Sequence, residues 1–210
     1  MRPVTSDEDA TVLADLITDC FSESFLVMGH LIEANASTGL AFASSSNSFG
    51  DTIKRADIAL YDAKANGRGR LSKFTKAMAD EIEHRHAIQV DLKRALADRE
   101  LTLNYQPVVE ATTGAISSVE ALLRWNSPTH GFVPPDLFVS SAEEVGLMAE
   151  LGRFVIEQAI EDAQRWPTLA TAINISPAQL RSATILSDLL EPAKKFGVSP
   201  SRITIEITES

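Results

Sequence analysis

The amino-acid sequence predicts an α/β protein. Segments with apolar residues at helical spacing alternate along the chain with short apolar segments typical of strands. After residue 115 the strand–helix order repeats, which favours parallel strands joined by crossover helices. The chain has 210 residues, of which 44% are hydrophobic, so it can bury one core or two small ones.

The N-terminal part is expected to fold as helix, strand, helix and strand. Thr5 and Glu8 have the spacing of a capping box at the start of the first helix. Gly67 is expected to stop the second helix. Cys20 falls on the apolar stripe of the first helix, so we expect a buried, inert thiol. The four expected elements cover residues 7–21, 30–42, 51–66 and 70–74.

A long helix over residues 75–98 is expected next, because charged residues are interleaved there with apolar residues at helical spacing. We interpret this helix as a connection between two domains. The expected boundaries are therefore 1–75 for the first domain, 76–98 for the linker helix and 99–210 for the second domain.

The second domain is expected to contain both strands and amphipathic helices. The expected strands cover residues 101–108, 116–125, 169–175 and 203–208. The expected helices cover residues 136–145, 147–163 and 186–196, with a further helical stretch capped by Ser176 and Pro177.

Polar side chains lie at or near the ends of three of these strands: Glu120 with Arg124, Asn174, and Glu206 with Glu209. The carboxyl ends of strands carry the functional residues in parallel α/β barrels. Carboxylate and amide oxygens are hard ligands, so this set suits Mg²⁺ or Mn²⁺ better than zinc.

Each of these residues also has a simpler interpretation. Glu120 could be a solvated strand residue, and Asn174 could form a turn before Ser176. Only their combined pattern points to a binding site.

Composition limits the classes of partner. The formal net charge is −10 and no block of lysine and arginine is present, so a DNA or RNA polymer is not expected as a partner. An anionic ligand would need a divalent metal or a few placed arginines. A single cysteine suits a reducing, cytoplasmic compartment. No segment has the length and apolarity of a membrane span, although a longer parent could carry an anchor.

Several motifs in the second domain resemble the EAL domain, a cyclic di-GMP phosphodiesterase built on a modified barrel. The resemblance rests on six segments in the family's order. These are YQP (105–107), EALLRW (120–125), GFVPP (131–135), FVSSAEEVGL (138–147), NISP with QL (174–180) and EITES (206–210).

The resemblance implies specific roles for the candidate residues. Glu120, Asn174 and Glu206 match metal ligands, which are expected to bind Mg²⁺ or Mn²⁺. Arg124 matches a substrate-phosphate contact and Gln106 another substrate contact. Glu209 matches a glutamate that orders an active-site loop.

The N-terminal domain resembles the rear half of a GGDEF (diguanylate cyclase) domain, through ASTGLA (36–41) and RADIALYDAKANGR (55–68). Lys64 and Arg68 match nucleotide-phosphate contacts and, four residues apart, are expected on one helix face. Favourable cations at a helix C-terminus are the interpretation that we prefer for this pair. Cyclase activity is not expected.

Together the resemblances imply a partial GGDEF α/β sandwich joined by a helix to an incomplete EAL-type modified TIM barrel. The family's aspartate pair and catalytic lysine would follow residue 210, so we expect a fragment that is inactive alone. Its parent would hydrolyse cyclic di-GMP to linear pGpG. The alternatives are a degenerate nucleotide-sensing or interaction module and a non-functional product of truncation. An open barrel edge at the strand over 203–208 would favour self-association.

Overall fold

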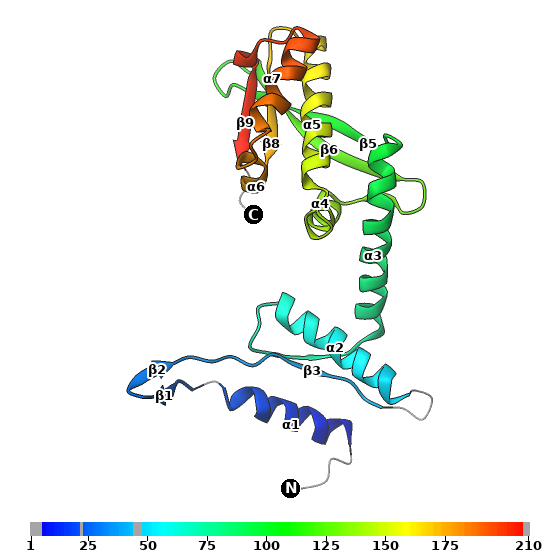
Figure 1. Ribbon diagram of the computed structural model, residues 1–210, viewed down its shortest axis with the longest axis vertical. Helices are drawn as coiled ribbons and strands as arrows, with labels where there is room; N and C mark the ends of the chain where they lie inside the picture. Colours follow the sequence, from blue (N-terminus) through cyan, green and yellow to red (C-terminus); the bar gives the residue numbers. More distant parts are fainter. Residues whose placement is uncertain (1–5, 22, 44–47, 208–210) are drawn as a thin grey trace. The chain divides into compact units, whose positions relative to one another are not determined.

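The computed structural model describes residues 6–21, 23–43 and 48–207. The chain divides into two compact units, residues 1–84 and 85–210 (Figure 1). The helix α3, Lys76–Ala97, continues through the boundary between them. None of the helices in the described ranges is both long and apolar enough to cross a membrane.

The described part of the first unit contains two complete helices, the start of α3 and two small sheets. Its elements are α1 (Asp7–Asp19), β1 (Phe25–Val27), β2 (His30–Ile32), β3 (Thr38–Leu40), α2 (Phe49–Ala65) and β4 (Leu71–Lys73). β1 and β2 form an antiparallel hairpin, and β3 pairs with β4 in parallel. The helices and β4 lie close to their expected ranges.

The expected single strand over 30–42 is wrong, because two separate strands, β2 and β3, occupy this range. The sequence pattern also missed β1. Met28 and Gly29 turn the chain back with φ values of 52° and 82°. Two positive φ angles are typical of a tight hairpin turn, so residues 30–32 pair locally with β1 and only the later residues reach β4.

Helix α2 packs closely on β3. Its N-terminus carries a reciprocal capping box between Ser48 and Asp51, and these hydrogen bonds lower the pKa of Asp51. Gly39 of β3 lies directly against the α2 backbone, where a Cβ would collide with Ala56 and Leu60. Only glycine permits this approach.

Cys20 is exposed rather than buried, which corrects the expectation from the sequence. It follows α1 at the helix C-cap. Ala14 is the one buried residue in the described part of α1, because this helix packs only partly on β3 and β4. Val12, Leu16 and Ile17 of its apolar stripe are exposed.

The second unit is built on a five-stranded mixed sheet. The strands are β5 (Leu101–Val109), β6 (Ile116–Ser127), β7 (Gly131–Val133), β8 (Ala170–Ile175) and β9 (Ile203–Ile207). Their order is β5-β6-β8-β9, with β7 paired to β6. β6, β8 and β9 are parallel, as the sequence predicts, whereas β5 and β7 run antiparallel to β6. β7 lies between the expected strand over 116–125 and the expected helix over 136–145, where the sequence pattern predicts no strand.

Helices α5 and α7 cover one face of this sheet (Figure 1). The helices of the unit are α4 (Pro135–Glu144), α5 (Met148–Asp162), α6 (Pro177–Leu180) and α7 (Ile185–Phe196), with short 3₁₀ turns at Ala163–Arg165 and Pro200–Arg202. Ile173 and Ile175 of β8 pack on Ile156 and Ile160 of α5 in the main core. Because side chains alternate along a strand, the intervening residues face the other way.

A second core cluster attaches α3 to the sheet. Ile88 and Leu92 are fully buried beside Trp125 of β6 and Phe138 of α4. The two aromatic rings meet edge to face, with centroids 5.9 Å apart. The C-terminal part of α3 is therefore a component of the second unit.

Candidate functional site

Strand register places four of the candidate side chains on one face of the sheet. Gln106 of β5 is the register partner of Glu120 on β6, and Asn174 of β8 is the partner of Glu206 on β9. Glu120 pairs with Ala172, two residues before Asn174. Register partners and alternate residues share a face, so the four polar side chains lie on the face opposite α5 and α7.

Asn174 contacts Glu120 directly. Its Nδ2 donates a hydrogen bond to Glu120 Oε1 at 2.7 Å in a partly buried environment. The neutral amide can approach the carboxylate without electrostatic repulsion. Because the contact uses the amide nitrogen, the amide oxygen can still act as a ligand.

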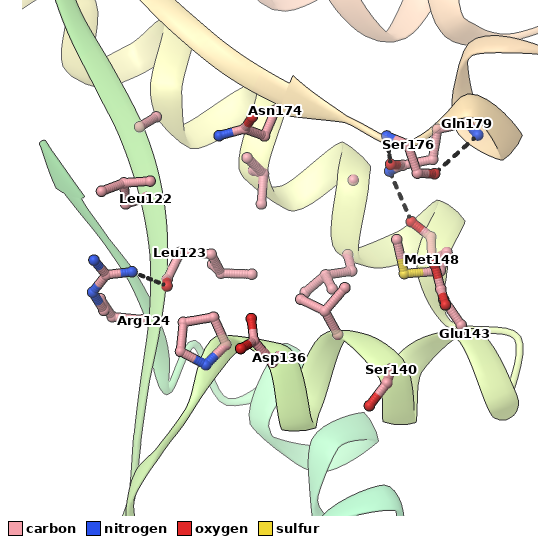
Figure 2. A pocket seen from close by; sticks show the side chains of 16 residues that line it. Leu122, Leu123, Arg124, Asp136, Ser140, Glu143, Met148, Asn174, Ser176 and Gln179 are labelled. Atoms are coloured by element: carbon pink, nitrogen blue, oxygen red, sulfur yellow. Dashed lines mark hydrogen bonds between the residues drawn. The ribbon is translucent and has the colours of Figure 1, made fainter. Parts of the chain in front are cut away.

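Arg124 lies on the same face of β6 as Glu120, four residues further along the strand. The guanidinium is half-buried, and its Nη1 donates to the carbonyl of Leu123 at 2.8 Å. Arg124 and Asn174 both line a pocket of about 700 Å³ (Figure 2). In Figure 2, Arg124 comes from β6 and Asn174 from β8. Glu120, Glu206 and Gln106 lie outside this lining.

Helix α4 contributes pocket residues that the sequence pattern did not identify: Asp136, Ser140 and Glu143 (Figure 2). Asp136 stands in the first turn of α4, where an acidic residue is ordinary. Ser140 and Glu143 lie in the motif FVSSAEEVGL (138–147), so the EAL resemblance was the available signal for them. Gln179 of α6 also lines the pocket; it lies in the motif over 174–180, which gives it no site role of its own.

A partly buried hydrogen-bond network around the buried Asp162 holds β5 in place on the helical side of the sheet. The hydroxyl of Tyr105 donates to Asp162 Oδ2 at 2.8 Å. Asp162 also pairs with Arg165 and accepts from Gln158. Burial, followed by the hydrogen bond to Asp162, raises the pKa of Tyr105. The network anchors the strand residue that precedes Gln106.

The expected pairing of Lys64 and Arg68 on one helix face is wrong. Helix α2 ends at Ala65, and Arg68 lies beyond it in a left-handed conformation with φ of 57°. Gly67, at φ of 112°, turns the chain away from the helix axis first. Both cationic side chains are exposed. The remaining candidate, Glu209, lies outside the described residues.

The candidate ligands are of the chemical type that a hard cation prefers, but the described residues supply only a few of them. Glu120, Asn174 and Glu206 offer only oxygen ligands from adjacent strands, as Mg²⁺ and Mn²⁺ require. Among the residues whose positions are described, no group of three or more His, Cys, Asp or Glu side chains is placed to hold a metal. The described part of the site thus supplies two carboxylates and one amide.

Residues 89–210, more than half of the chain, match the family model for the EAL domain. The chain belongs to the EAL domain family. The EAL region therefore includes the second half of α3 and the entire five-stranded sheet.

Two curated relatives carry informative names. The bifunctional diguanylate cyclase/cyclic di-GMP phosphodiesterase MucR of Pseudomonas aeruginosa is 31% identical over 96% of this chain. The cyclic di-GMP phosphodiesterase PdeR of Escherichia coli is 36% identical over 86% of this chain. This chain spans 30% and 28% of their respective lengths.

A solved structure shares the fold of the EAL region. The MucR phosphodiesterase in complex with c-di-GMP aligns with a TM-score of 0.56 and 34% sequence identity. The alignment covers 59% of this chain and 52% of that chain.

Proposed function

We propose that this chain is part of a cyclic di-GMP signalling protein. In the complete protein, the EAL domain would bind cyclic di-GMP and hydrolyse it to linear pGpG with Mg²⁺ or Mn²⁺. The observation that carries the proposal is the row of Gln106, Glu120, Asn174 and Glu206 on one sheet face of an EAL family member. The names of the relatives MucR and PdeR support it.

In this proposal Glu120, Asn174 and Glu206 hold the cation. The Asn174–Glu120 hydrogen bond orients one ligand against the next. A bound divalent cation would polarise the phosphodiester and activate water. Glu209 is proposed to order an active-site loop.

Arg124 and Gln106 are proposed to bind the substrate. A charge-assisted hydrogen bond from the Arg124 guanidinium would hold a phosphate oxygen, and the amide of Gln106 would contact the nucleotide. This local positive charge matters, because the chain carries a formal net charge of −10 and would otherwise repel a dianionic dinucleotide.

We also propose the domain organisation 1–75, 76–98 and 99–210: the C-terminal part of a GGDEF domain, a linker helix whose second half packs on the EAL unit and falls within the EAL match, and the N-terminal part of an EAL domain. The motifs over 36–41 and 55–68 support the GGDEF assignment, as does the extended match to a relative named as bifunctional. Lys64 and Arg68 are proposed to be idle. The single cysteine suits a cytoplasmic setting.

A second candidate function is nucleotide sensing without hydrolysis. It is favoured by the small number of described ligand candidates, because only two carboxylates, Glu120 and Glu206, share the sheet face with the phosphate-binding candidate Arg124. We expect the 210 residues by themselves to behave in this way, because a two-metal site needs more anionic ligands than these.

Isothermal titration calorimetry with cyclic di-GMP and Mn²⁺, followed by chromatography for pGpG, tests both candidates. We expect measurable binding by the 210-residue chain and no pGpG above the buffer control. Arg124→Ala should weaken binding, whereas Arg181→Ala, an exposed arginine outside the pocket, should not. The absence of binding heat would contradict the proposal. Formation of pGpG would show that the chain is catalytically sufficient.

A further inference from the structure

The Gln179 side chain joins α6 to the start of α5. Its Oε1 accepts from the backbone N–H of Ser176 at 2.9 Å, and the backbone N–H of Gln179 donates to Ser176 Oγ at 3.3 Å. Its Nε2 donates to the carbonyl of Met148, 31 residues earlier, at 3.1 Å (Figure 2). The amide therefore uses both of its ends, one for a local cap and the other for a tertiary contact.

Gly152 of α5 provides the space for this contact. The glycine is buried, and a Cβ at this position would collide with Gln179 Nε2. Gly152 has ordinary helical geometry, so glycine provides space here for the flexible end of the Gln179 side chain rather than backbone freedom. A glycine in a helix interior costs about 1 kcal/mol relative to alanine. The docked amide gives that position a structural purpose.

We call the contacts of the Gln179 side chain with Ser176 and Met148 the Gln179 lock. The lock lies next to the point where β8 stops pairing with β6. The ladder between β6 and β8 ends at Ile173, so Asn174 has no backbone partner on β6. Beyond that point β8 pairs only with β9, up to Ile175. Gln179 fixes Ser176, the next residue, to α5. Asn174 therefore lies between the last residue of β8 that pairs with β6, Ile173, and Ser176, which the Gln179 lock fixes to α5.

We propose that Gln179, seated against Gly152, is a positioning residue for Asn174. It fixes the end of β8 so that the Asn174 amide meets Glu120 and faces the pocket. Gln179, Gly152 and Met148 also line a second pocket of about 430 Å³, so the lock forms the wall between the two cavities. The expected effect on cation binding rests on the proposed function, whereas the effect on Asn174 does not.

The experiment combines NMR of the Asn174 side-chain amide with Mn²⁺ titration of the 210-residue chain. Gln179→Glu keeps the acceptor for Ser176 but removes the donor to Met148, and Gly152→Ala expels the side chain sterically. We expect either variant to shift the Asn174 amide signals and to weaken Mn²⁺ binding about tenfold, as loss of a residue that orients a ligand does. Gln164→Ala, which removes an exposed glutamine on the 3₁₀ turn after α5, is the matched control.

The double variant Gly152→Ala/Gln179→Ala separates positioning from general destabilisation. The two substitutions remove the same contact, that between Gln179 and Met148 beside Gly152. The double variant should therefore bind Mn²⁺ no more weakly than the single variant Gln179→Ala. Circular dichroism identifies the temperature range in which every variant is folded. Additive losses, or wild-type Asn174 signals in Gln179→Glu and Gly152→Ala, would overturn the proposal. If the wild-type chain binds no Mn²⁺, the cation site fails, and the Asn174 signals alone decide the positioning role.

Discussion

Asn174 and Glu120 are separated by 54 residues in the sequence and by 2.7 Å between their polar atoms. An amide at position 174 can donate to the carboxylate, whereas an acid there would repel it. The choice of asparagine rather than aspartate therefore has a testable electrostatic consequence.

Asn174→Asp should make the stability of the second unit depend on pH. Two carboxylates at this separation raise the pKa of one of them in the folded state. A raised folded-state pKa adds stability at low pH that is lost as the pH rises through it. Urea unfolding should therefore show a larger deficit relative to wild type at pH 8 than at pH 5.

Mn²⁺ should reduce the deficit at pH 8 if the two carboxylates share a cation. Asn126→Asp, at an exposed position on β6, the strand of Glu120, is the control and should show no comparable dependence. Equal deficits of the Asn174→Asp variant at both pH values would contradict the contact between residues 174 and 120.

Tyr105 should contribute to stability up to alkaline pH. Removing its hydroxyl in Tyr105→Phe leaves buried Asp162 one donor short, which should cost about 1–2 kcal/mol at pH 7. The pKa of Tyr105 is raised in the folded state, so ionisation favours unfolding above the ordinary tyrosine pKa of about 10. Wild-type stability should fall as the pH rises past 10.

Urea unfolding at pH 7 and pH 11 measures both effects. The difference between wild type and Tyr105→Phe should shrink at pH 11. Tyr61→Phe, at an exposed tyrosine of α2, should change neither value. A Tyr105→Phe variant as stable as wild type at pH 7 would show that the hydroxyl makes no net contribution.

At the scale of elements, the second half of α3 belongs to the folded EAL unit rather than to a flexible connection. Leu92 is fully buried in the cluster around Trp125, whereas Val90, two residues earlier, is 62% exposed. Because the two residues lie on the same helix and differ in burial, substitutions at them compare a buried position with an exposed one.

Leu92→Ala should destabilise the second unit by about 2–5 kcal/mol, because it deletes buried methyl groups and leaves a cavity. Val90→Ala should change stability by less than about 0.5 kcal/mol. Tryptophan fluorescence during urea unfolding measures both. Similar effects of the two substitutions would mean that α3 does not pack on the sheet.

At the scale of the whole molecule, β9 pairs only with β8 among the residues with described positions. Ile207 on this strand is 58% exposed. A strand with one edge unpaired and with exposed apolar side chains can pair with another chain. We therefore propose that the 210-residue chain associates with itself through this edge.

Ile207→Lys should shift the chain towards monomer in sedimentation velocity experiments, because a charge on an edge strand opposes pairing between chains. Leu190→Lys, an equivalent change at an exposed position of α7, should leave the distribution unchanged. A wild-type chain that is monomeric at every concentration would contradict the proposed association.

Local patterns predicted most of the long helices, because a helix is stabilised largely within one segment. Helices α3, α5 and α7 lie within a few residues of their expected ranges. Short strands were predicted less well. β1 and β7 have three residues each, too few for alternation to be recognised, and their pairing depends on a turn.

The sequence by itself determined the α/β class, the candidate ligand types and the resemblance to the EAL domain, because these depend on residue identity and spacing. Only the tertiary structure decided that Asn174 meets Glu120, that Arg68 leaves the helix of Lys64, and that Gly152 receives Gln179. Each depends on backbone conformation or on the register of segments far apart in the chain. No local pattern specifies such geometry, because it is set by the packing of the whole unit.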